Sequence, residues 1–246
     1  MALYLSLAGM ACGVLPNARF GNENMTSAEF FESPSMIAAA TAVEKQDIAA
    51  LEGMARAGLD VNRPGKHGMT LLIWSLNGQK KRSLEKLLAL RADPNAKLES
   101  GDTAVAFAAA AKDIGMLRLL LDHGGDPNAL NRDGSPATFG ALDRRLWDNY
   151  ELLMAHGADP EAKNRMGQTA LVRMAVLECF DYVATLLDRG ASIRDVDNAG
   201  ATVAWYVQDS RVGSDAGQRE ARDRVMKMLE QRGVKFPVAL HPVRKP

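Results

Sequence analysis

Two successive stretches of the chain carry the pattern that decides its fold. Residues 101–133 read GDTAVAFAAAAKDIGMLRLLLDHGGDPNALNRD, and residues 134–166 read GSPATFGALDRRLWDNYELLMAHGADPEAKNRM. The second stretch matches the first without a gap, from its leading glycine to the DP pair near its end. Similarity at a fixed interval of 33 residues indicates a repeated unit, and such units stack on one another to bury a common core.

The same interval continues through most of the chain. It links a column of glycines and a column of aspartates, which are Gly68, Gly101, Gly134, Gly167 and Gly200, and Asp60, Asp93, Asp126 and Asp159. An apolar triad keeps the same register, as in Leu84, Leu87 and Leu88. Spacing of i, i+3 and i+4 places three side chains on one face of an α-helix. Each unit is therefore predicted to contain a short helix with one buried face.

A longer motif begins at each glycine of the column. It reads GMTLLIWS at 68–75, GDTAVAFA at 101–108, GSPATFGA at 134–141, GQTALVRM at 167–174 and GATVAWYV at 200–207. This motif resembles the G-x-T-P-L-H-x-A stretch of the ankyrin repeat, whose unit is a β-turn finger followed by two antiparallel helices. The resemblance implies an all-α fold, an ankyrin-repeat solenoid of stacked helix-turn-helix units with β-turn fingers. It covers residues 33–236, in units near 33–65, 66–98, 99–131, 132–164, 165–197 and 198–236, and leaves 237–246 as a tail.

Two further columns predict where the helices begin and end. Threonines stand where the family caps the first helix of a unit, at Thr70, Thr103, Thr169 and Thr202, with Pro136 in their place in one unit. Glycines stand where the second helix ends, at Gly58, Gly124, Gly157 and Gly190. Glycine adopts the left-handed conformation of such a position at little cost. The histidine of the family motif is absent throughout, which indicates a divergent array.

Composition argues against several classes of function. The chain has 246 residues, with 30 Lys and Arg against 30 Asp and Glu, so it has no basic excess for binding nucleic acid. Its two cysteines, Cys12 and Cys179, form no CxxC pair. His123 and His156 are expected about 8–10 Å apart on adjacent units, too far to share a metal ion. No metal and no cofactor is predicted, and Cys179 is interpreted as a half-buried structural residue.

No catalytic residue is predicted either. Too few residues lie outside 33–236 to form a catalytic domain, and the glycines of the repeats are turn residues and form no phosphate-binding loop. The last unit is the largest, because Gly190 and Gly233 are 43 residues apart where 33 are expected. The ten extra residues are placed near 211–220, between the two helices of that unit. They form either a loop on the binding face or a tolerated extension of the terminal unit.

The N-terminal part of the chain has a different character. Residues 2–15 contain no charged side chain, and this apolar run fits the core of a secretory signal peptide within a leader at 1–18. Gly9 and Ala11 precede Cys12, an arrangement that loosely resembles a bacterial lipobox and makes Cys12 a candidate for lipidation. No basic residue precedes the run, so the alternative is a disordered or docked apolar leader on a cytoplasmic protein. Residues 19–32 are interpreted as a linker that ends in a Phe30-Phe31 staple.

The candidate binding residues lie on the face made by fingers and first helices. One column of this concave face contains Trp74, Phe107, Gly140, Arg173 and Tyr206. Trp, Tyr and Arg are enriched at binding hot spots, so the column is a candidate partner-binding surface. The alternative is that Trp74 and Phe107 pack between fingers and stabilise the array. The finger tips add Lys66, His67, Glu99, Asp102, Arg132, Asp133, Arg165 and Asn198, whose mixed charges favour a protein partner.

The sequence therefore predicts a non-catalytic module that binds a partner protein through its concave face. Exported bacterial ankyrin proteins include inhibitors of secreted toxins and phospholipases, so the resemblance implies an envelope-located immunity-type protein with a co-encoded toxin or lipase as partner. It would lie in the periplasm, or at the membrane through a lipid on Cys12. Two alternatives stay open, a structural self-assembling scaffold and a cytoplasmic adaptor. Sedimentation tests the first, and fractionation with determination of the mature N-terminus tests the second.

Overall fold

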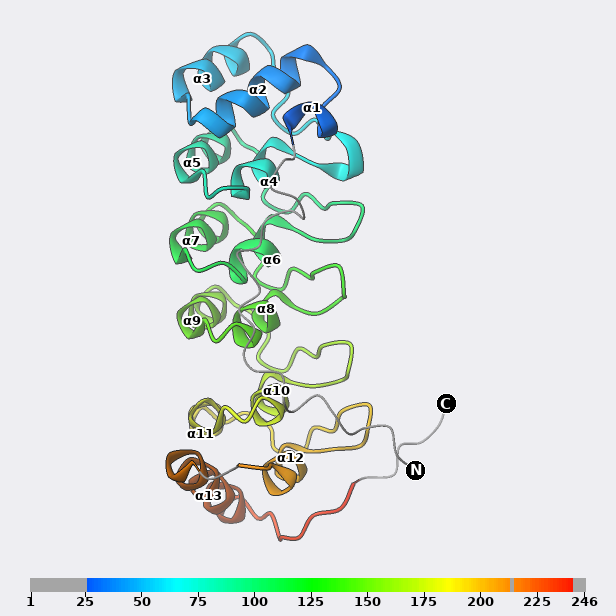
Figure 1. The fold of residues 1–246 in the computed structure, drawn as a ribbon, viewed down its shortest axis with the longest axis vertical. Helices are drawn as coiled ribbons and strands as arrows, with labels where there is room; N and C mark the ends of the chain where they lie inside the picture. The colour runs from blue at the N-terminus through cyan, green and yellow to red at the C-terminus, as the bar shows by residue number, and fades with distance from the viewer. Residues whose placement is uncertain (1–25, 213–214, 241–246) are drawn as a thin grey trace.

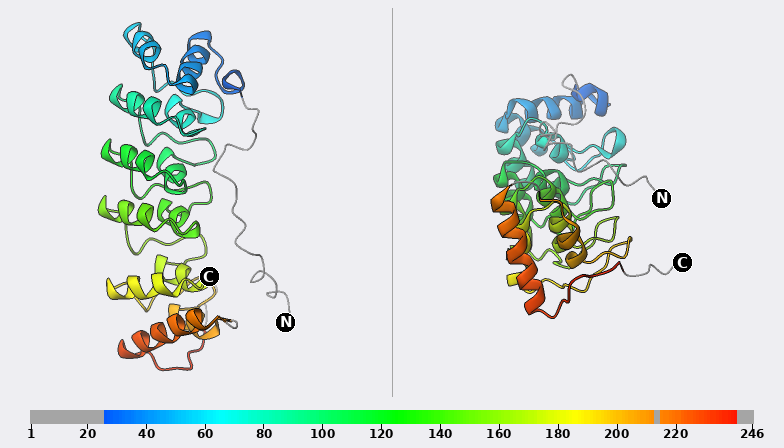
Figure 2. Two further views of the ribbon diagram at one scale, coloured as in Figure 1. Left: turned by 60° about the vertical axis from the view of Figure 1, so that its left-hand side comes forward. Right: turned by 60° about the horizontal axis from the view of Figure 1, so that its bottom comes forward.

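The computed structural model describes residues 26–212 and 215–240 of the chain. In this part the helices form a column of antiparallel pairs, with hairpin-like fingers projecting to one side (Figures 1 and 2). The leader at 1–18 and Cys12 lie outside the described residues, as does the first half of the predicted linker. The export and lipidation predictions therefore stay predictions.

Each of the six predicted units contains one pair of helices. The first helices are α2 (Pro34–Lys45), α4 (Leu71–Leu76), α6 (Ala104–Ala109), α8 (Ala137–Asp143), α10 (Ala170–Val176) and α12 (Val203–Asp209). The second helices are α3 (Ile48–Arg56), α5 (Lys81–Ala89), α7 (Ile114–Asp122), α9 (Trp147–Ala155), α11 (Phe180–Asp188) and α13 (Ala216–Gln231). Strand pairing in the described residues is limited to isolated bridges in two fingers, Lys97 with Thr103 and Leu130 with Pro136. The prediction of an all-α solenoid is confirmed.

The predicted helix caps are present. The side chains of Thr70, Thr103, Thr169 and Thr202 each accept a hydrogen bond from the backbone N–H three residues later, at 3.2–3.4 Å. Such a bond satisfies one of the N–H groups that a helix leaves unpaired at its start. Pro136 makes no capping bond, and the N–H of Ala137 instead donates to the carbonyl of Ala129 at 2.8 Å. The fourth unit therefore keeps its first helix without the threonine.

The ends of the second helices also follow the prediction. Gly157 has a φ of 92°, and the other three glycines of its column have similar values. In the second unit the corresponding residue is Arg91, which adopts the same left-handed region with a φ of 64°. That conformation is unfavourable for a residue with a side chain, so the turn holds Arg91 in a strained state.

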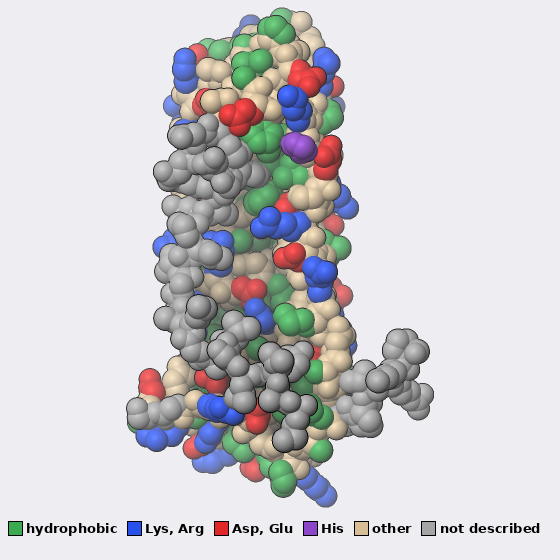
Figure 3. Space-filling view, turned by 45° about the vertical axis from the view of Figure 1, so that its right-hand side comes forward, with side chains coloured by type: hydrophobic (Ala, Val, Ile, Leu, Met, Phe, Trp, Pro, Cys, Tyr) green, Lys and Arg blue, Asp and Glu red, His purple; other side chains and the backbone are tan. Residues whose placement is uncertain are grey.

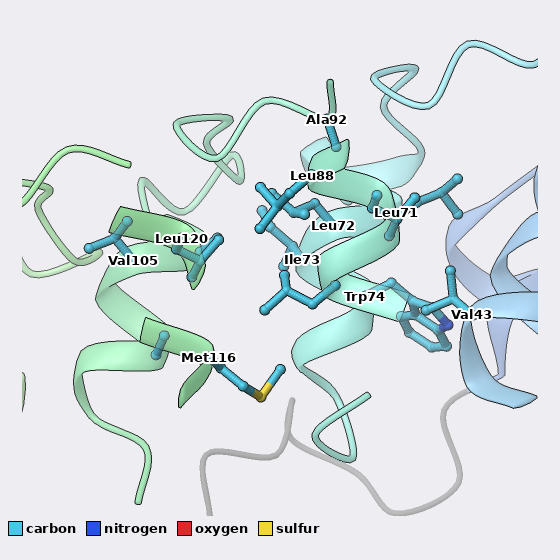
Figure 4. Packing of buried hydrophobic residues seen from close by; sticks show 14 of the residues in the cluster. Val43, Leu71, Leu72, Ile73, Trp74, Leu88, Ala92, Val105, Met116 and Leu120 are labelled. Carbon is cyan, nitrogen blue, oxygen red and sulfur yellow. The ribbon is translucent and has the colours of Figure 1, made fainter. Parts of the chain in front are cut away.

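The core lies between the two helices of each unit and between neighbouring units. Figure 4 shows how α4 contributes Leu72 and Ile73 on the side that faces Val105 of α6 and Leu120 of α7. All four side chains are essentially inaccessible to solvent. The buried side chains form two clusters, one reaching from Phe31 to Ala158 and the other from Ala141 to Leu229. The core therefore divides within the fourth unit.

The segment before the first unit differs from its predicted role as a linker. Within residues 26–32 the chain forms a short helix, α1 (Ser27–Phe30), and the Phe31 side chain is buried. The rings of Phe30 and Phe31 lie 5.6 Å and 6.1 Å from the ring of Trp74, measured between centroids. The two phenylalanines therefore pack against Trp74 of the second unit, and the described part of the linker belongs to the folded body.

The extra residues of the last unit also differ from the prediction. They mostly lengthen the second helix, since α13 has 16 residues where α11 has 9. Asp215 caps α13 by accepting hydrogen bonds from the N–H groups of Gly217 and Gln218, at 2.8 and 3.1 Å. The Arg- and Glu-rich sequence that follows has good helix propensity. The predicted loop at 211–220 is therefore wrong for residues 216–220, which are helical.

The beginning of the predicted tail is attached to the last unit. The N–H of Val238 donates to Gln208 Oε1 of α12 at 2.7 Å, and Gln208 Nε2 donates back to the carbonyl of Val238 at 3.2 Å.

Among the described residues, none of the helices has the length and apolar character needed to cross a bilayer.

Candidate partner-binding face

The predicted column on the first helices begins with a buried residue. Trp74 is 2% exposed, and its indole N–H donates to Glu44 Oε1 at 3.1 Å. Together with Phe30 and Phe31 it fills the space between the first two units. The prediction that Trp74 lies in an accessible binding stripe is corrected, because the α1 segment covers the ring. Beside it lies a hollow of about 370 Å³ whose lining includes Glu44, Asn77 and Lys80.

The next three positions of the column are partly accessible. Phe107 on α6, Gly140 on α8 and Arg173 on α10 are each half-buried. Gly140 has no side chain, and a Cβ placed there would meet the methyl group of Ala110 at 3.4 Å. Arg173 Nε donates to Asp143 Oδ1 at 2.7 Å, and the Arg173 side chain is 19% exposed. These positions therefore combine an apolar ring, a glycine and a guanidinium that is paired with Asp143.

Tyr206 ends the column on α12. Its hydroxyl donates to Asp197 Oδ2 at 2.6 Å, and its ring packs edge-to-face against Trp205. Burial, followed by the hydrogen bond to Asp197, raises the pKa of Tyr206 to about 12. The hydroxyl is therefore neutral over the physiological range and ties the first helix of the last unit to the finger before it.

Many of the predicted finger-tip residues contact the neighbouring finger. His67 Nδ1 lies 3.1 Å from Glu99 Oε2, Arg165 NH1 lies 3.7 Å from Asp133 Oδ1, and Lys66 Nζ lies 3.8 Å from Glu32 Oε1. Asn198 donates to the carbonyl of Arg165 at 2.9 Å. Figure 3 shows the resulting alternation of acidic and basic side chains along the fingers. These contacts link the fingers in a row while leaving the charged groups exposed.

Asp102 is an exception among the predicted tips. It is 7% exposed, and it accepts hydrogen bonds from the Ser100 hydroxyl at 3.0 Å and from the N–H of Arg132 at 2.9 Å. Its expected accessibility is corrected, because the carboxylate holds two fingers together. The adjoining Arg132 side chain is exposed.

Two exposed apolar residues on the fingers were not predicted. Leu130 is 47% exposed and Met166 is 50% exposed. The sequence held a signal for Leu130, because the equivalent residues of the neighbouring units are Lys97 and Lys163. Lysines at these positions indicate that the position is exposed to solvent. Single exposed apolar residues are common on protein surfaces, so they add apolar area to the finger side without defining a site by themselves.

The histidines and the described cysteine have local roles. His123 Nδ1 lies 2.9 Å from the carbonyl of Leu119, and His156 Nε2 lies 3.6 Å from Asp122 Oδ1. Cys179 is buried at the start of α11. Within the described residues no group of three or more His, Cys, Asp or Glu side chains is placed to hold a metal ion.

Stacked helix pairs with a row of fingers define a helical repeat solenoid, a class that presents an extended surface to other molecules. Residues 71–164 match the family model described as ankyrin repeats in three copies. Residues 71–164 are therefore ankyrin repeats, and ankyrin repeats form a protein-interaction module that is typically a non-catalytic scaffold. A search of curated proteins finds no match to the sequence.

Solved structures show the same fold. The ankyrin repeat protein EF0377 is 24% identical over 79% of this chain and 96% of its own, with a TM-score of 0.65. The ankyrin repeat domain of Bcl-3, a member of the IkappaB family, is 21% identical over 78% of this chain and 85% of its own, with a TM-score of 0.66. A chain of the complex between a predatory endopeptidase from Bdellovibrio bacteriovorus and an immunity protein is also similar. It is 21% identical over 79% of this chain and 97% of its own, with a TM-score of 0.62.

Proposed function

We propose that this protein is a non-catalytic binder that holds one partner protein against its concave face, in the manner of an inhibitor or immunity-type protein. The observation that carries the proposal is the set of Phe107, Gly140 and Arg173 at one register of three successive first helices. An apolar ring and a guanidinium held in place by Asp143 suit a protruding apolar side chain next to an acidic one. Buried aromatic and Arg contacts of this kind supply much of the energy of protein interfaces.

The similarity to a chain from an endopeptidase–immunity protein complex supports the inhibitor version of the proposal. That similarity concerns the fold, so the class of partner follows from the surface and from the resemblance to exported ankyrin inhibitors. A secreted toxin or lipase encoded near the gene is the partner we propose, and the envelope is the proposed location. Fractionation of the native host with intact-mass determination of the mature N-terminus tests the location, which a cytosolic chain starting at Met1 would contradict.

The binding proposal is tested with the purified chain and the product of such a neighbouring gene. Phe107→Ala combined with Arg173→Ala is expected to weaken binding at least tenfold, about 1.4 kcal/mol, with an unchanged helical circular dichroism spectrum. Arg118→Ala is the matched control, because Arg118 is exposed on the second helix α7. Equal binding by the double variant and the wild type would contradict the concave-face site. Self-association of the wild type in sedimentation, lost in the double variant, would instead support a scaffold.

A further inference from the structure

A repeated hydrogen-bonded rung joins the first four units. At the joint between the third and fourth units, Asn128 Nδ2 donates to the carbonyl of Gly157 at 3.4 Å, and Asn128 Oδ1 accepts from the N–H of Asp159 at 2.8 Å. Asn95 makes the same two bonds to the third unit, at 2.9 and 2.8 Å. Asn62 makes them to the second unit, at 3.0 and 2.7 Å. One carboxamide per joint thus pairs with one carbonyl and one N–H of the next unit.

The rung is missing at the joint between the fourth and fifth units. Glu161 occupies the position of the three asparagines, and a carboxylate has no N–H to donate. The backbone groups that a carboxamide would meet are the carbonyl of Gly190 and the N–H of Ser192, by the 33-residue correspondence. Within the part of the chain that the structure describes, neither group makes a hydrogen bond. The backbone carbonyl and N–H that would bond to a carboxamide are therefore present, and the carboxamide itself is absent.

A cavity of about 260 Å³ lies at this joint. Glu161, Gly190 and Ser192 line it on the side of the missing rung, and apolar side chains such as Leu171 and Leu186 line the rest. Helices α9 and α11 are set farther apart than the second helices of the earlier units, as Figure 1 shows. Aromatic rings lie between them, since Trp147 stacks on Tyr150 and on Tyr182 with centroids 4.9 Å and 4.5 Å apart.

A largely buried tyrosine also lines this cavity. Tyr150 lines the cavity and is 3% exposed, and its hydroxyl makes no hydrogen bond to any described residue. No fully buried side-chain oxygen or nitrogen among the described residues lacks a partner, so solvent must reach this hydroxyl. The cavity provides the route.

We propose that the cavity between the fourth and fifth units binds the side-chain carboxamide of an Asn or Gln residue from a partner protein, which takes the place of the missing rung. The NH₂ group would donate to the carbonyl of Gly190, and the amide oxygen would accept from the N–H of Ser192. The apolar lining suits the methylene groups that carry the amide. This site goes beyond the concave-face proposal and does not depend on it.

The chemistry of the cavity favours an amide over a charged group. A carboxylate could accept from Ser192 but could not donate to Gly190, and it would meet the like charge of Glu161. An ammonium group could donate to Gly190 but could not accept from Ser192. The nearby charged groups are mostly paired, Lys163 with Asp195 at 2.7 Å and Arg189 with Glu151. A neutral group with one donor side and one acceptor side fits this environment.

The test is a titration of the full-length ¹⁵N-labelled chain with propionamide, followed by the NMR signal of the Ser192 N–H. We expect a saturable shift at Ser192 with a dissociation constant on the order of millimolar, as suits so small a ligand. Propionate is the matched control probe, because it has the same shape and no N–H, and it should give no saturable shift there.

Two variants of one position separate the site from general effects. Glu161→Asn should supply the rung from within the chain and reduce the response to propionamide at least tenfold. Glu161→Ala removes the carboxylate without supplying an amide, so it should respond as the wild type does. The proposal would be overturned by the absence of a saturable shift in the wild type, by an equal response to propionate, or by an undiminished response in Glu161→Asn.

Discussion

The joint between the third and fourth units and the joint between the fourth and fifth connect the same kind of helix pair in different ways. The first is closed by Asn128, and leucines of α7 and α9 share one buried cluster there, whereas the second has Glu161, a cavity and a stack of aromatic rings. The fold of a unit is thus set by its caps and turns, which both joints keep. The strength of coupling between units depends on a few side chains that differ.

This difference divides the array into two blocks. The N-terminal block, residues 33–164, has a rung at every joint, and the C-terminal block, residues 165–236, follows the joint without one. At the fingers the blocks stay connected, since Arg165 NH1 lies 3.7 Å from Asp133 Oδ1 and Lys163 Nζ lies 2.7 Å from Asp195 Oδ1. In a repeat protein stability is approximately the sum of unit and interface contributions. A weak interface allows one block to unfold before the other.

The largest effect is expected from cavities in the two cores. Leu120 and Leu229 are both fully buried, one in each cluster. Leu120→Ala and Leu229→Ala should each cost about 2–5 kcal/mol, because a buried side chain is removed and the space is only partly refilled. Hydrogen exchange should show lost protection confined to 165–236 in Leu229→Ala and centred on the N-terminal block in Leu120→Ala. Uniform loss over both blocks in both variants would contradict the division.

A smaller effect is expected from removing a rung. Asn128→Ala deletes two hydrogen bonds at the joint between the third and fourth units, and at about 0.5–1.5 kcal/mol each the cost should be about 1–2 kcal/mol. The fourth unit should then exchange its amide hydrogens together with the C-terminal block. Urea unfolding gives the free energy, and Asn62→Ala at the first joint serves as the comparison. A cost below about 0.3 kcal/mol at both joints would show that the rungs do not couple the units.

The reverse change should strengthen the weak joint. Glu161→Asn supplies the missing carboxamide, so we expect a gain of about 1 kcal/mol and closer agreement between the unfolding midpoints of the two blocks. Trp147 reports on the joint by fluorescence, and far-ultraviolet circular dichroism reports on the whole array. Glu161→Ala controls for loss of the carboxylate. An equal gain in Glu161→Ala would assign the effect to charge and not to the rung.

The sequence predicted the fold because the fold is periodic. The threonine and glycine columns mark helix ends through local hydrogen bonds and backbone conformation, and both are confirmed at Thr103 and Gly157. The extended α13 was missed because the inserted residues have no equivalent residues in the other units with which they could be compared. Residues 216–220 were assigned to a loop although their helix propensity and the Asp215 cap favour a helix.

The candidate site was less predictable because accessibility depends on residues outside the repeat. Trp74 and Phe107 occupy the same column, yet Trp74 is buried because Phe30 and Phe31 pack on it from a segment with no periodic pattern. Asp102 is buried by a contact with the next finger, which depends on the conformation of two loops at once. The only sequence signal for the cavity at the fourth joint is Glu161 in place of an asparagine. That signal could be interpreted only once the structure showed which backbone groups bond to the equivalent asparagines.

The smallest effect concerns the response of the two blocks to alkaline pH. Tyr150 and Tyr206 both lie at or beyond the weak joint, and burial raises the pKa of each to about 12. In the unfolded chain these hydroxyls ionise near pH 10. Their contribution to stability is therefore complete below about pH 10 and is lost as the pH rises toward 12. The C-terminal block should lose protection in this range before the N-terminal block does.

Tyr206→Phe isolates one of the two tyrosines. The variant loses the hydrogen bond to Asp197, so it should be about 1 kcal/mol less stable at neutral pH, and its stability should fall less steeply between about pH 10 and 12. Urea unfolding at a series of pH values measures both quantities. Tyr182→Phe is the control, because Tyr182 stacks on Trp147 through its ring and the substitution retains the ring. If Tyr206→Phe keeps the full alkaline slope, the Tyr206 hydroxyl does not hold the C-terminal block together, and the weak joint must respond to pH through Tyr150.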